Sequence, residues 1–254
     1  MATNLLIGNA GVGINLTSVS VNNTAHARYP VKNLFGGTKP DYFKLATATS
    51  GDTRITINTT SQTTNFLYLA KAITLKNDDV GTITVKGHSS DNYGAATTVA
   101  TISSFGSATM IGTDSDDYLA TWATSSSFPW WYINYNASAV SLIMHSKAFL
   151  GQSFDPGKDP TGTIVSTRVK PLGVNRRSKL SFDISWEGIS YAKAVEMYQK
   201  FYRPRRRSPI VLYTVDYHDI LFDKKAIFGR VLDMTVPPRQ TDYCDVTMSV
   251  EELP

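Results

Sequence analysis

Residues 1 to about 150 consist of short runs in which apolar and polar side chains alternate, separated by turn-forming residues. The clearest runs are Arg54–Asn58 and Gly81–Gly87. Because successive side chains of a β-strand point to opposite faces, such alternation is typical of strands with one buried face. The runs are rich in β-branched residues and lie between Gly, Asn and Asp clusters. We therefore predict an all-β domain over residues 1–151, folded as an antiparallel β-sandwich.

A segment rich in breakers of regular structure follows this domain. It carries Asp155-Pro156-Gly157 and Asp159-Pro160 within a dozen residues. Proline removes a backbone donor and fits neither a central strand nor a helix interior. The pattern predicts an interdomain linker over residues 152–173.

The rest of the chain, residues 174–254, shows a change of period that indicates an α+β domain. The run from Lys179 to Trp186 alternates, and apolar residues then recur at three- and four-residue spacing as far as Tyr202. Ser190 is a suitable N-cap and Pro204 ends the pattern, which predicts one amphipathic helix over about 190–203. Alternation returns in three later runs, so we expect one helix packed on a β-sheet.

Composition narrows the classes of protein that the chain can belong to. The 254 residues suffice for two domains, and 42% hydrophobic residues suffice for two cores. The single cysteine, Cys244, excludes an internal disulfide. The N-terminus lacks the pattern of a signal peptide, and no run approaches the ~20 apolar residues of a membrane span. The net charge of +4 arises entirely after Asp155, since acidic and basic residues balance up to and including it.

No arrangement of residues indicates catalysis or metal binding. The histidines His26, His88, His145 and His218 are scattered and lack the spacing of metal ligands. The carboxylates around His218 fit a polar turn between two strands as well as they fit acid–base chemistry. We therefore predict a protein that is not an enzyme, with no cofactor and no metal.

Two groups of residues are candidates for contacts with partners. The basic group after the helix, a candidate interface, contains Arg203, Arg205, Arg206 and Arg207. It suits an acidic protein surface or a solvated face; phosphate contact is the alternative, but nucleic acid is not the expected partner because the nearby aromatics belong to the helix core. The aromatic group, a candidate sugar-stacking platform or else part of the core, contains Tyr42, Trp122, Trp130 and Trp131.

Several of these motifs together resemble a known family. Tyr29–Gly37 leads through a turn to Tyr42-Phe43, a Trp130–Ile133 strand follows much later, and Ala148–Gly151 forms the exit. This order resembles the discoidin-like (coagulation factor 5/8 C-terminal type) domains of phage tail proteins, which are jelly-roll β-sandwiches. Gly36-Gly37-Thr38 replaces the common Asp-Gly-Asp turn, so the resemblance does not carry over a calcium site.

The resemblance implies a structural component of a phage tail tip. Such a distal tail or adaptor protein is expected to form a homo-oligomeric ring, a hexamer or trimer, that joins the tail tube to the baseplate or receptor-binding parts. The expected partners are tail tube, hub and fibre proteins, and the expected location is the virion after assembly in the host cytoplasm. The alternative function is a glycan-binding module or adhesin that contacts a bacterial surface polysaccharide.

Overall fold

The computed structural model describes residues 5–9, 16–35, 43–47, 49–71, 81–105, 118–141, 144–168, 179–203, 209–214, 226–238 and 241–253. The chain divides into two compact units. Ala10–Gln152 forms the first, which we call the sandwich unit. Met1–Asn9 and Ser153–Pro254 together form the second, which we call the helix–sheet unit.

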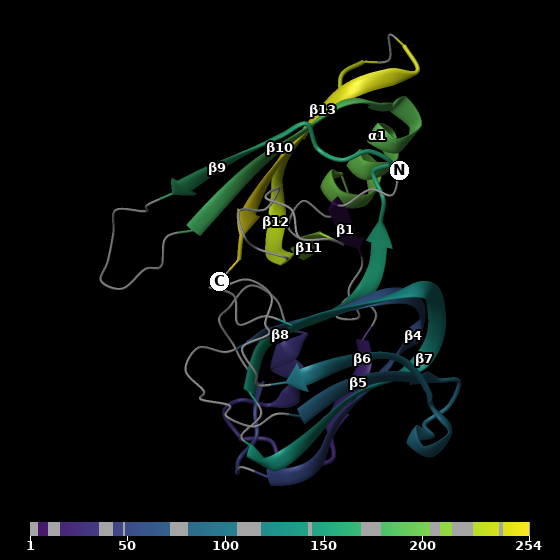
Figure 1. Ribbon diagram of the computed structural model, residues 1–254, viewed down its shortest axis with the longest axis vertical. Coiled ribbons are helices and arrows are strands. Elements are labelled where there is room, and N and C mark those ends of the chain that lie inside the picture. The colour runs from purple at the N-terminus through teal and green to yellow at the C-terminus, as the bar shows by residue number, and fades with distance from the viewer. Residues whose placement is uncertain are drawn as a thin grey trace. The chain divides into compact units, whose positions relative to one another are not determined.

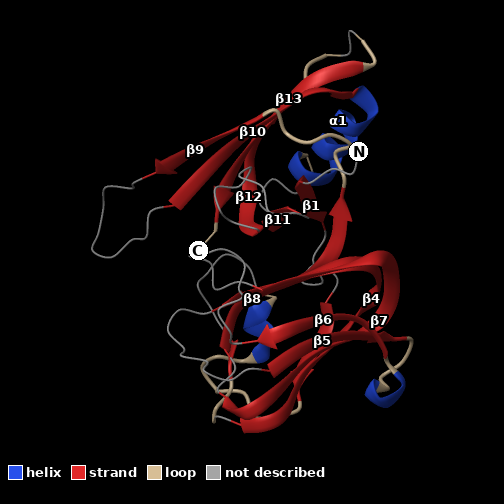
Figure 2. Ribbon diagram, viewed as in Figure 1, coloured by secondary structure: helices blue, strands red, loops and turns tan. Residues whose placement is uncertain are grey.

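The sandwich unit is composed of strands and two short 3₁₀ turns in its described part (Figure 2). Its elements are β2 (Leu16–Val21), η2 (Val31–Leu34), β3 (Phe43–Lys44), β4 (Thr49–Lys71), β5 (Gly81–His88), η3 (Tyr93–Ala95), β6 (Thr97–Phe105), β7 (Tyr118–Ser141) and β8 (Met144–Phe154), whose last two residues belong to the helix–sheet unit.

Two long strands, β4 and β7, pair with each other along most of their length (Figure 1). They take part in both sheets of the sandwich: the first sheet also contains β2, β5 and β6, and the second also contains β3 and β8. The first part of β4 also pairs with β2, and the last part of β7 pairs with β5, which pairs with β6. The last part of β4 pairs instead with β8, which also pairs with β3. The β4–β7 register shifts at Asn58/Gln62 and Thr64/Phe66, where the strands pass from one sheet to the other.

One hydrophobic core lies between these two sheets. It joins Ile57 and Trp131 of the first sheet to Leu67 and Leu150 of the second. Side chains of β4 and β7 alternate between this core and the opposite face, as the sequence pattern requires. The predicted antiparallel β-sandwich is confirmed.

The helix–sheet unit contains an antiparallel sheet in the order β1-β11-β12-β13-β10-β9. Its elements are β1 (Leu5–Asn9), β9 (Gly162–Arg168), β10 (Lys179–Ser190), α1 (Tyr191–Met197), η4 (Tyr198–Tyr202), β11 (Pro209–Thr214), β12 (Ala226–Thr235) and β13 (Tyr243–Glu252).

The helix begins where the sequence predicts it. The Ser190 hydroxyl accepts a hydrogen bond from the Lys193 N–H at 3.4 Å, which is the N-cap contact. After Met197 the helix widens into a π-turn, η4, and the Arg203 N–H donates to the Tyr198 carbonyl at 2.9 Å. Met197 and Phe201 are buried against the sheet, so the predicted amphipathic helix on a sheet is confirmed.

Two features of the predicted domain organisation differ from the structure. The segment predicted as a linker over 152–173 contains the end of β8 and strand β9, which pairs with β10 from Gly162 to Arg168, so in its described part only residues 155–161 lack strand or helix. Strand β1 falls within the predicted sandwich domain over 1–151 but belongs to the helix–sheet unit, because Leu5–Gly8 pairs with Val211–Thr214. Pairing between segments about two hundred residues apart leaves no local signal in the sequence.

Candidate functional site

The four aromatic candidates from the sequence occupy different environments. Trp131 is 0% exposed, and its indole N–H donates to the Phe128 carbonyl at 2.8 Å. Its place in the core means that it cannot stack on a ligand, which corrects the expectation for this residue. Trp122 is half-buried and packs on Trp131 with ring centres 6.3 Å apart, at the edge of the core. Tyr42 lies outside the described residues.

Trp130 lies on the opposite face of β7 from Trp131. It is half-buried and pairs in register with Asn58 of β4 and His88 of β5. Its even-numbered neighbours Tyr132 and Asn134 share this face. These residues belong to the face of the β4–β7–β5 sheet that points away from the core.

The strand register arranges this face as three cross-strand rows. We call the set below, with the Asp91–Tyr93 turn beside it, the outer face. The rows, read from β4 across β7 to β5, are Asn58, Trp130 and His88; Thr56, Tyr132 and Lys86; and Arg54, Asn134 and Thr84. The outer face therefore combines indole, imidazole, amide, hydroxyl and cationic groups, whereas Tyr132 at its centre is 0% exposed.

A turn after β5 covers the middle row. Tyr93 packs edge-on against Tyr132 with ring centres 5.4 Å apart. The Tyr132 hydroxyl donates to the Asp91 carboxylate at 3.1 Å and to the Ser90 carbonyl at 3.3 Å. Burial, followed by the Asp91 contact, raises the pKa of Tyr132 to about 12. The phenol consequently remains a neutral donor over the whole ordinary pH range.

Two cations lie against the same tyrosine ring. The guanidinium carbon of Arg54 is 4.3 Å from the centre of the Tyr93 ring, and the ammonium nitrogen of Lys86 is 4.4 Å from it. Arg54 comes from β4 and Lys86 from β5, the strands on either side of β7. Both distances fall within the range of cation–π attraction, so the pair fixes the position of Tyr93 on the sheet.

Two buried polar atoms of the outer face lack a hydrogen-bond partner in the described structure. They are Nε of Arg54 and Oδ1 of Asn134, whose residues are register partners on β4 and β7. Asn134 is only 4% exposed. Leaving a buried donor or acceptor unpaired costs about 1–3 kcal/mol, so such a pair is suited to a bound water or to a ligand that supplies hydroxyl and oxyanion groups.

The helix–sheet unit carries a separate open hollow of about 420 Å³ beside the helix. Tyr191, Val195, Tyr198, Gln199, Arg203, Met234, Thr235 and Val236 line it. Arg203, a candidate interface residue, is exposed here, whereas Arg205, Arg206 and Arg207 lie outside the described residues.

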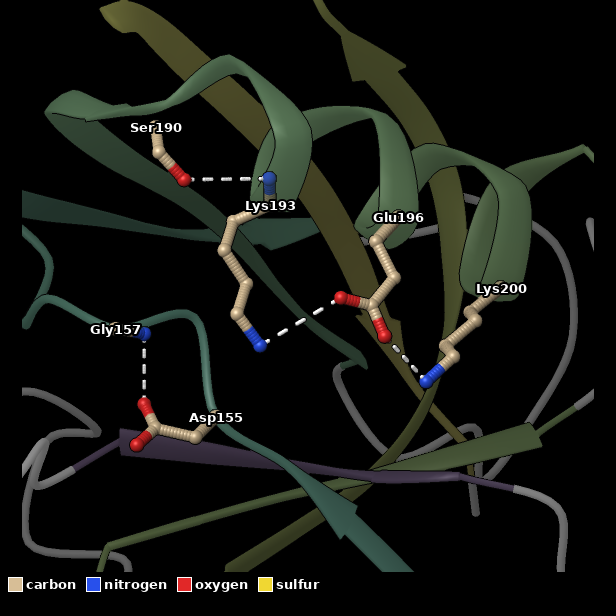
Figure 3. Close-up of polar contacts among 6 residues, drawn as sticks. All are labelled: Asp155, Gly157, Ser190, Lys193, Glu196 and Lys200. Carbon is tan, nitrogen blue, oxygen red and sulfur yellow. Dashed lines mark hydrogen bonds and ion pairs between the residues drawn. The ribbon is translucent and has the colours of Figure 1, made fainter.

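The exposed side of the helix carries a charge network that is already paired (Figure 3). The Glu196 carboxylate lies 2.6 Å from the Lys200 ammonium and 3.5 Å from that of Lys193. Lys200 is the main cause of the lowered pKa of Glu196. Both ammonium groups also lie over the Phe154 ring, at 4.7 and 5.0 Å. These lysines stabilise the helix and do not form a free basic patch.

Within the part of the chain that the structure describes, no three His, Cys, Asp or Glu side chains gather as metal ligands would. Among the same residues, no helix is long and apolar enough to cross a membrane.

No family model matches the chain, and no curated protein matches it. Solved structures similar to it include the CBM32-1 and CBM32-2 domains of Clostridium perfringens ZmpB, with 9% identity and a TM-score of 0.43 over 60% of this chain and 41% of that chain. The family 32 CBM of C. perfringens NanJ in complex with galactose has 10% identity and a TM-score of 0.43, over 56% of this chain and 97% of that one. Chitosan-binding module 1 from the chitosanase/glucanase of Paenibacillus sp. IK-5 has 16% identity and a TM-score of 0.43, over 56% and 98%.

The chain spans less than half of the ZmpB fragment.

The sequence pattern singles out Trp130 but not the residues around it. Arg54, Lys86 and Asn134 lie in three segments that come together only through strand pairing. Their even-numbered positions in alternating runs place each on a polar face, but only the register shows that the three faces are continuous.

Proposed function

We propose that the chain is a carbohydrate-binding protein that contacts a bacterial surface polysaccharide through the outer face of the sandwich unit. The observation that carries this proposal is the placement of half-buried Trp130 between Asn58 and His88, on the same face as the unpaired polar atoms of Arg54 and Asn134, which lie two cross-strand rows away. The Tyr93 ring, packed on the buried Tyr132, holds the middle row between them in place.

The chemistry of a sugar ring matches this arrangement. A pyranose presents apolar C–H groups on its faces and hydroxyl groups around its edge. An indole ring offers an apolar surface for the C–H groups, whereas amide, imidazole and guanidinium groups hydrogen-bond hydroxyls. A binding face of this kind needs no catalytic group, because orientation and hydrogen bonding suffice for recognition.

The Trp130→Ala variant tests this proposal. We expect its affinity for a glycan that the wild-type protein retains on a printed array of bacterial polysaccharides to fall by about 10-fold or more, since one aromatic contact contributes on the order of 1–3 kcal/mol. The thermal unfolding midpoint should change little, because Trp130 lies outside the hydrophobic core.

Trp122→Ala is the matched control for that variant. Trp122 is half-buried like Trp130 but packs on the core side, against Trp131. This control should lower stability and leave the affinity of the remaining folded protein unchanged. Equal loss of affinity in both variants, or retention of no glycan by the wild type, contradicts the proposal.

A second candidate function, a ring-forming tail-tip component of a phage particle, is favoured by one feature of the helix–sheet unit. Among the strands that the structure describes, β9 is the last of its sheet, and Ile164 on it is 70% exposed. An unpaired strand edge with an exposed large apolar residue is suited to pairing with another chain. The two functions are compatible, since a particle component can also bind a glycan.

Light scattering on the purified chain tests this second candidate. A ring gives a mass that is a multiple of the 27.9 kDa monomer, and Ile164→Lys should shift it toward the monomer. A monomer at every concentration would contradict self-assembly through β9.

A further inference from the structure

The outer face carries two positive charges without a negative partner. Neither Arg54 nor Lys86 has a carboxylate within 4.0 Å among the described residues, and each has the Tyr93 ring as its neighbour instead. By contrast, Lys193 and Lys200 in the helix–sheet unit share the Glu196 carboxylate, and Arg230 lies 2.7 Å from Glu251. The cations of the outer face are therefore not balanced as those of the other unit are.

The carboxylate that belongs to the outer face, Asp91, has a different contact. Asp91 accepts the hydroxyl hydrogen of Tyr132 at 3.1 Å. This hydrogen bond fixes the turn that holds Tyr93, while neither cation has a carboxylate within 4.0 Å among the described residues. Two cations held on a common aromatic ring repel each other, and an oxyanion that contacts both relieves that repulsion.

The row of Arg54 and Asn134 also offers one unpaired donor and one unpaired acceptor to an anionic sugar. Nε of Arg54 is a buried donor, and Oδ1 of Asn134 is a buried acceptor. An oxyanion on a sugar accepts hydrogen bonds from a guanidinium, and a neighbouring sugar hydroxyl donates one to an amide oxygen. A neutral sugar satisfies the same two atoms but leaves both positive charges uncompensated.

We propose that the glycan bound by the outer face is anionic, and that Arg54 and Lys86 bind its oxyanion, a sugar carboxylate or phosphate. This inference rests on the proposed carbohydrate-binding function and specifies its ligand class. Asn134 holds the adjacent hydroxyl, and Trp130 packs on a sugar ring in the row beyond Tyr132.

A glycan array with matched pairs tests the proposal. The pairs are sialyllactose and lactose, oligogalacturonate and its methyl ester, and a phosphate-substituted polysaccharide with its dephosphorylated form. The wild-type protein should retain the anionic member of at least one pair about 10-fold more strongly than its neutral partner. The carboxylate and phosphate pairs distinguish the two sources of the oxyanion.

Two variants locate the effect. Arg54→Gln and Lys86→Gln should each weaken binding of the retained anionic glycan by about 10-fold. Arg28→Gln is the matched control, because Arg28 is an exposed arginine of the same unit whose guanidinium lies 5.7 Å from the Tyr29 ring centre. The control should change the affinity less than about 2-fold, since an exposed charge away from the ligand is screened.

The salt dependence of wild-type binding tests the same proposal without any variant, so the test remains possible if a variant does not fold. Raising the salt concentration from about 0.05 to 0.5 M should weaken wild-type binding about 10-fold if the two cations hold the ligand. Equal retention of neutral and anionic members, unaffected by salt, overturns the anionic ligand and leaves carbohydrate binding intact. Retention of no glycan at all overturns both proposals.

Discussion

Replacing Trp131 with alanine is expected to lower the free energy of unfolding of the sandwich unit by about 3–5 kcal/mol. Trp131 is 0% exposed and contacts the edge of the Phe128 ring with centres 5.3 Å apart. Gly87, its register partner on β5, leaves the space that Phe128 occupies, since a Cβ there would lie 2.1 Å from that ring. A smaller side chain leaves a cavity that this interlocked group cannot close.

Urea-induced unfolding followed by circular dichroism measures this effect. The Trp131→Phe variant should lose about 1–3 kcal/mol, because it removes both volume and the indole N–H that pairs with the Phe128 carbonyl. A loss below about 1 kcal/mol for Trp131→Ala would place this tryptophan outside the core and contradict the assigned face of β7.

Replacing Trp186 with alanine is expected to destabilise the helix–sheet unit by a similar amount, about 3–5 kcal/mol. Trp186 is completely buried in β10, in the same cluster as Phe201 of the helix. Its indole N–H, however, has no hydrogen-bond partner in the described structure. The stabilising contribution of Trp186 therefore comes from packing.

Phenylalanine at this position separates packing from hydrogen bonding. Trp186→Phe should cost less than Trp131→Phe, because it removes an unpaired donor whose burial is itself unfavourable. Chemical denaturation of the two phenylalanine variants under identical conditions gives the comparison. Equal losses would mean that the N–H of Trp186 is paired in solution.

The elements that could be predicted from the sequence are those with a local signal. Alternation in β4 and β5, the period change after Trp186 and the Ser190 cap each depend on neighbouring residues. They led to the correct fold class and to a helix within one residue of its observed end at Tyr202.

The face of β7 could also have been assigned from the sequence. Trp130 and Tyr132 share their parity with Asn134, whereas Trp131 shares its parity with Ile133 and Tyr135. The polar member marks the set that faces away from the core, and Trp131, Ile133 and Tyr135 all belong to the hydrophobic core of the sandwich unit. Considering the two tryptophans without Asn134 led to the incorrect inclusion of Trp131 among the ligand contacts.

Non-local pairing could not be predicted. The candidate site depends on Arg54, Lys86 and Asn134 meeting across three strands, and the sequence does not specify that register. Strand β9 was missed because Asp155, Pro156 and Pro160 just before it indicated a linker that continues past residue 161. Breakers mark where regular structure stops, but not where it resumes.

The most direct test of the central claim is to map the ligand contact by NMR. Amide chemical shifts of the full chain are recorded with and without an anionic oligosaccharide retained on the array. We expect the largest chemical-shift changes on the outer face, in β4 near Arg54, in β5 near Lys86 and in β7 from Trp130 to Asn134. Changes that cluster instead around the hollow beside the helix, or at residues far from these strands, would contradict this claim.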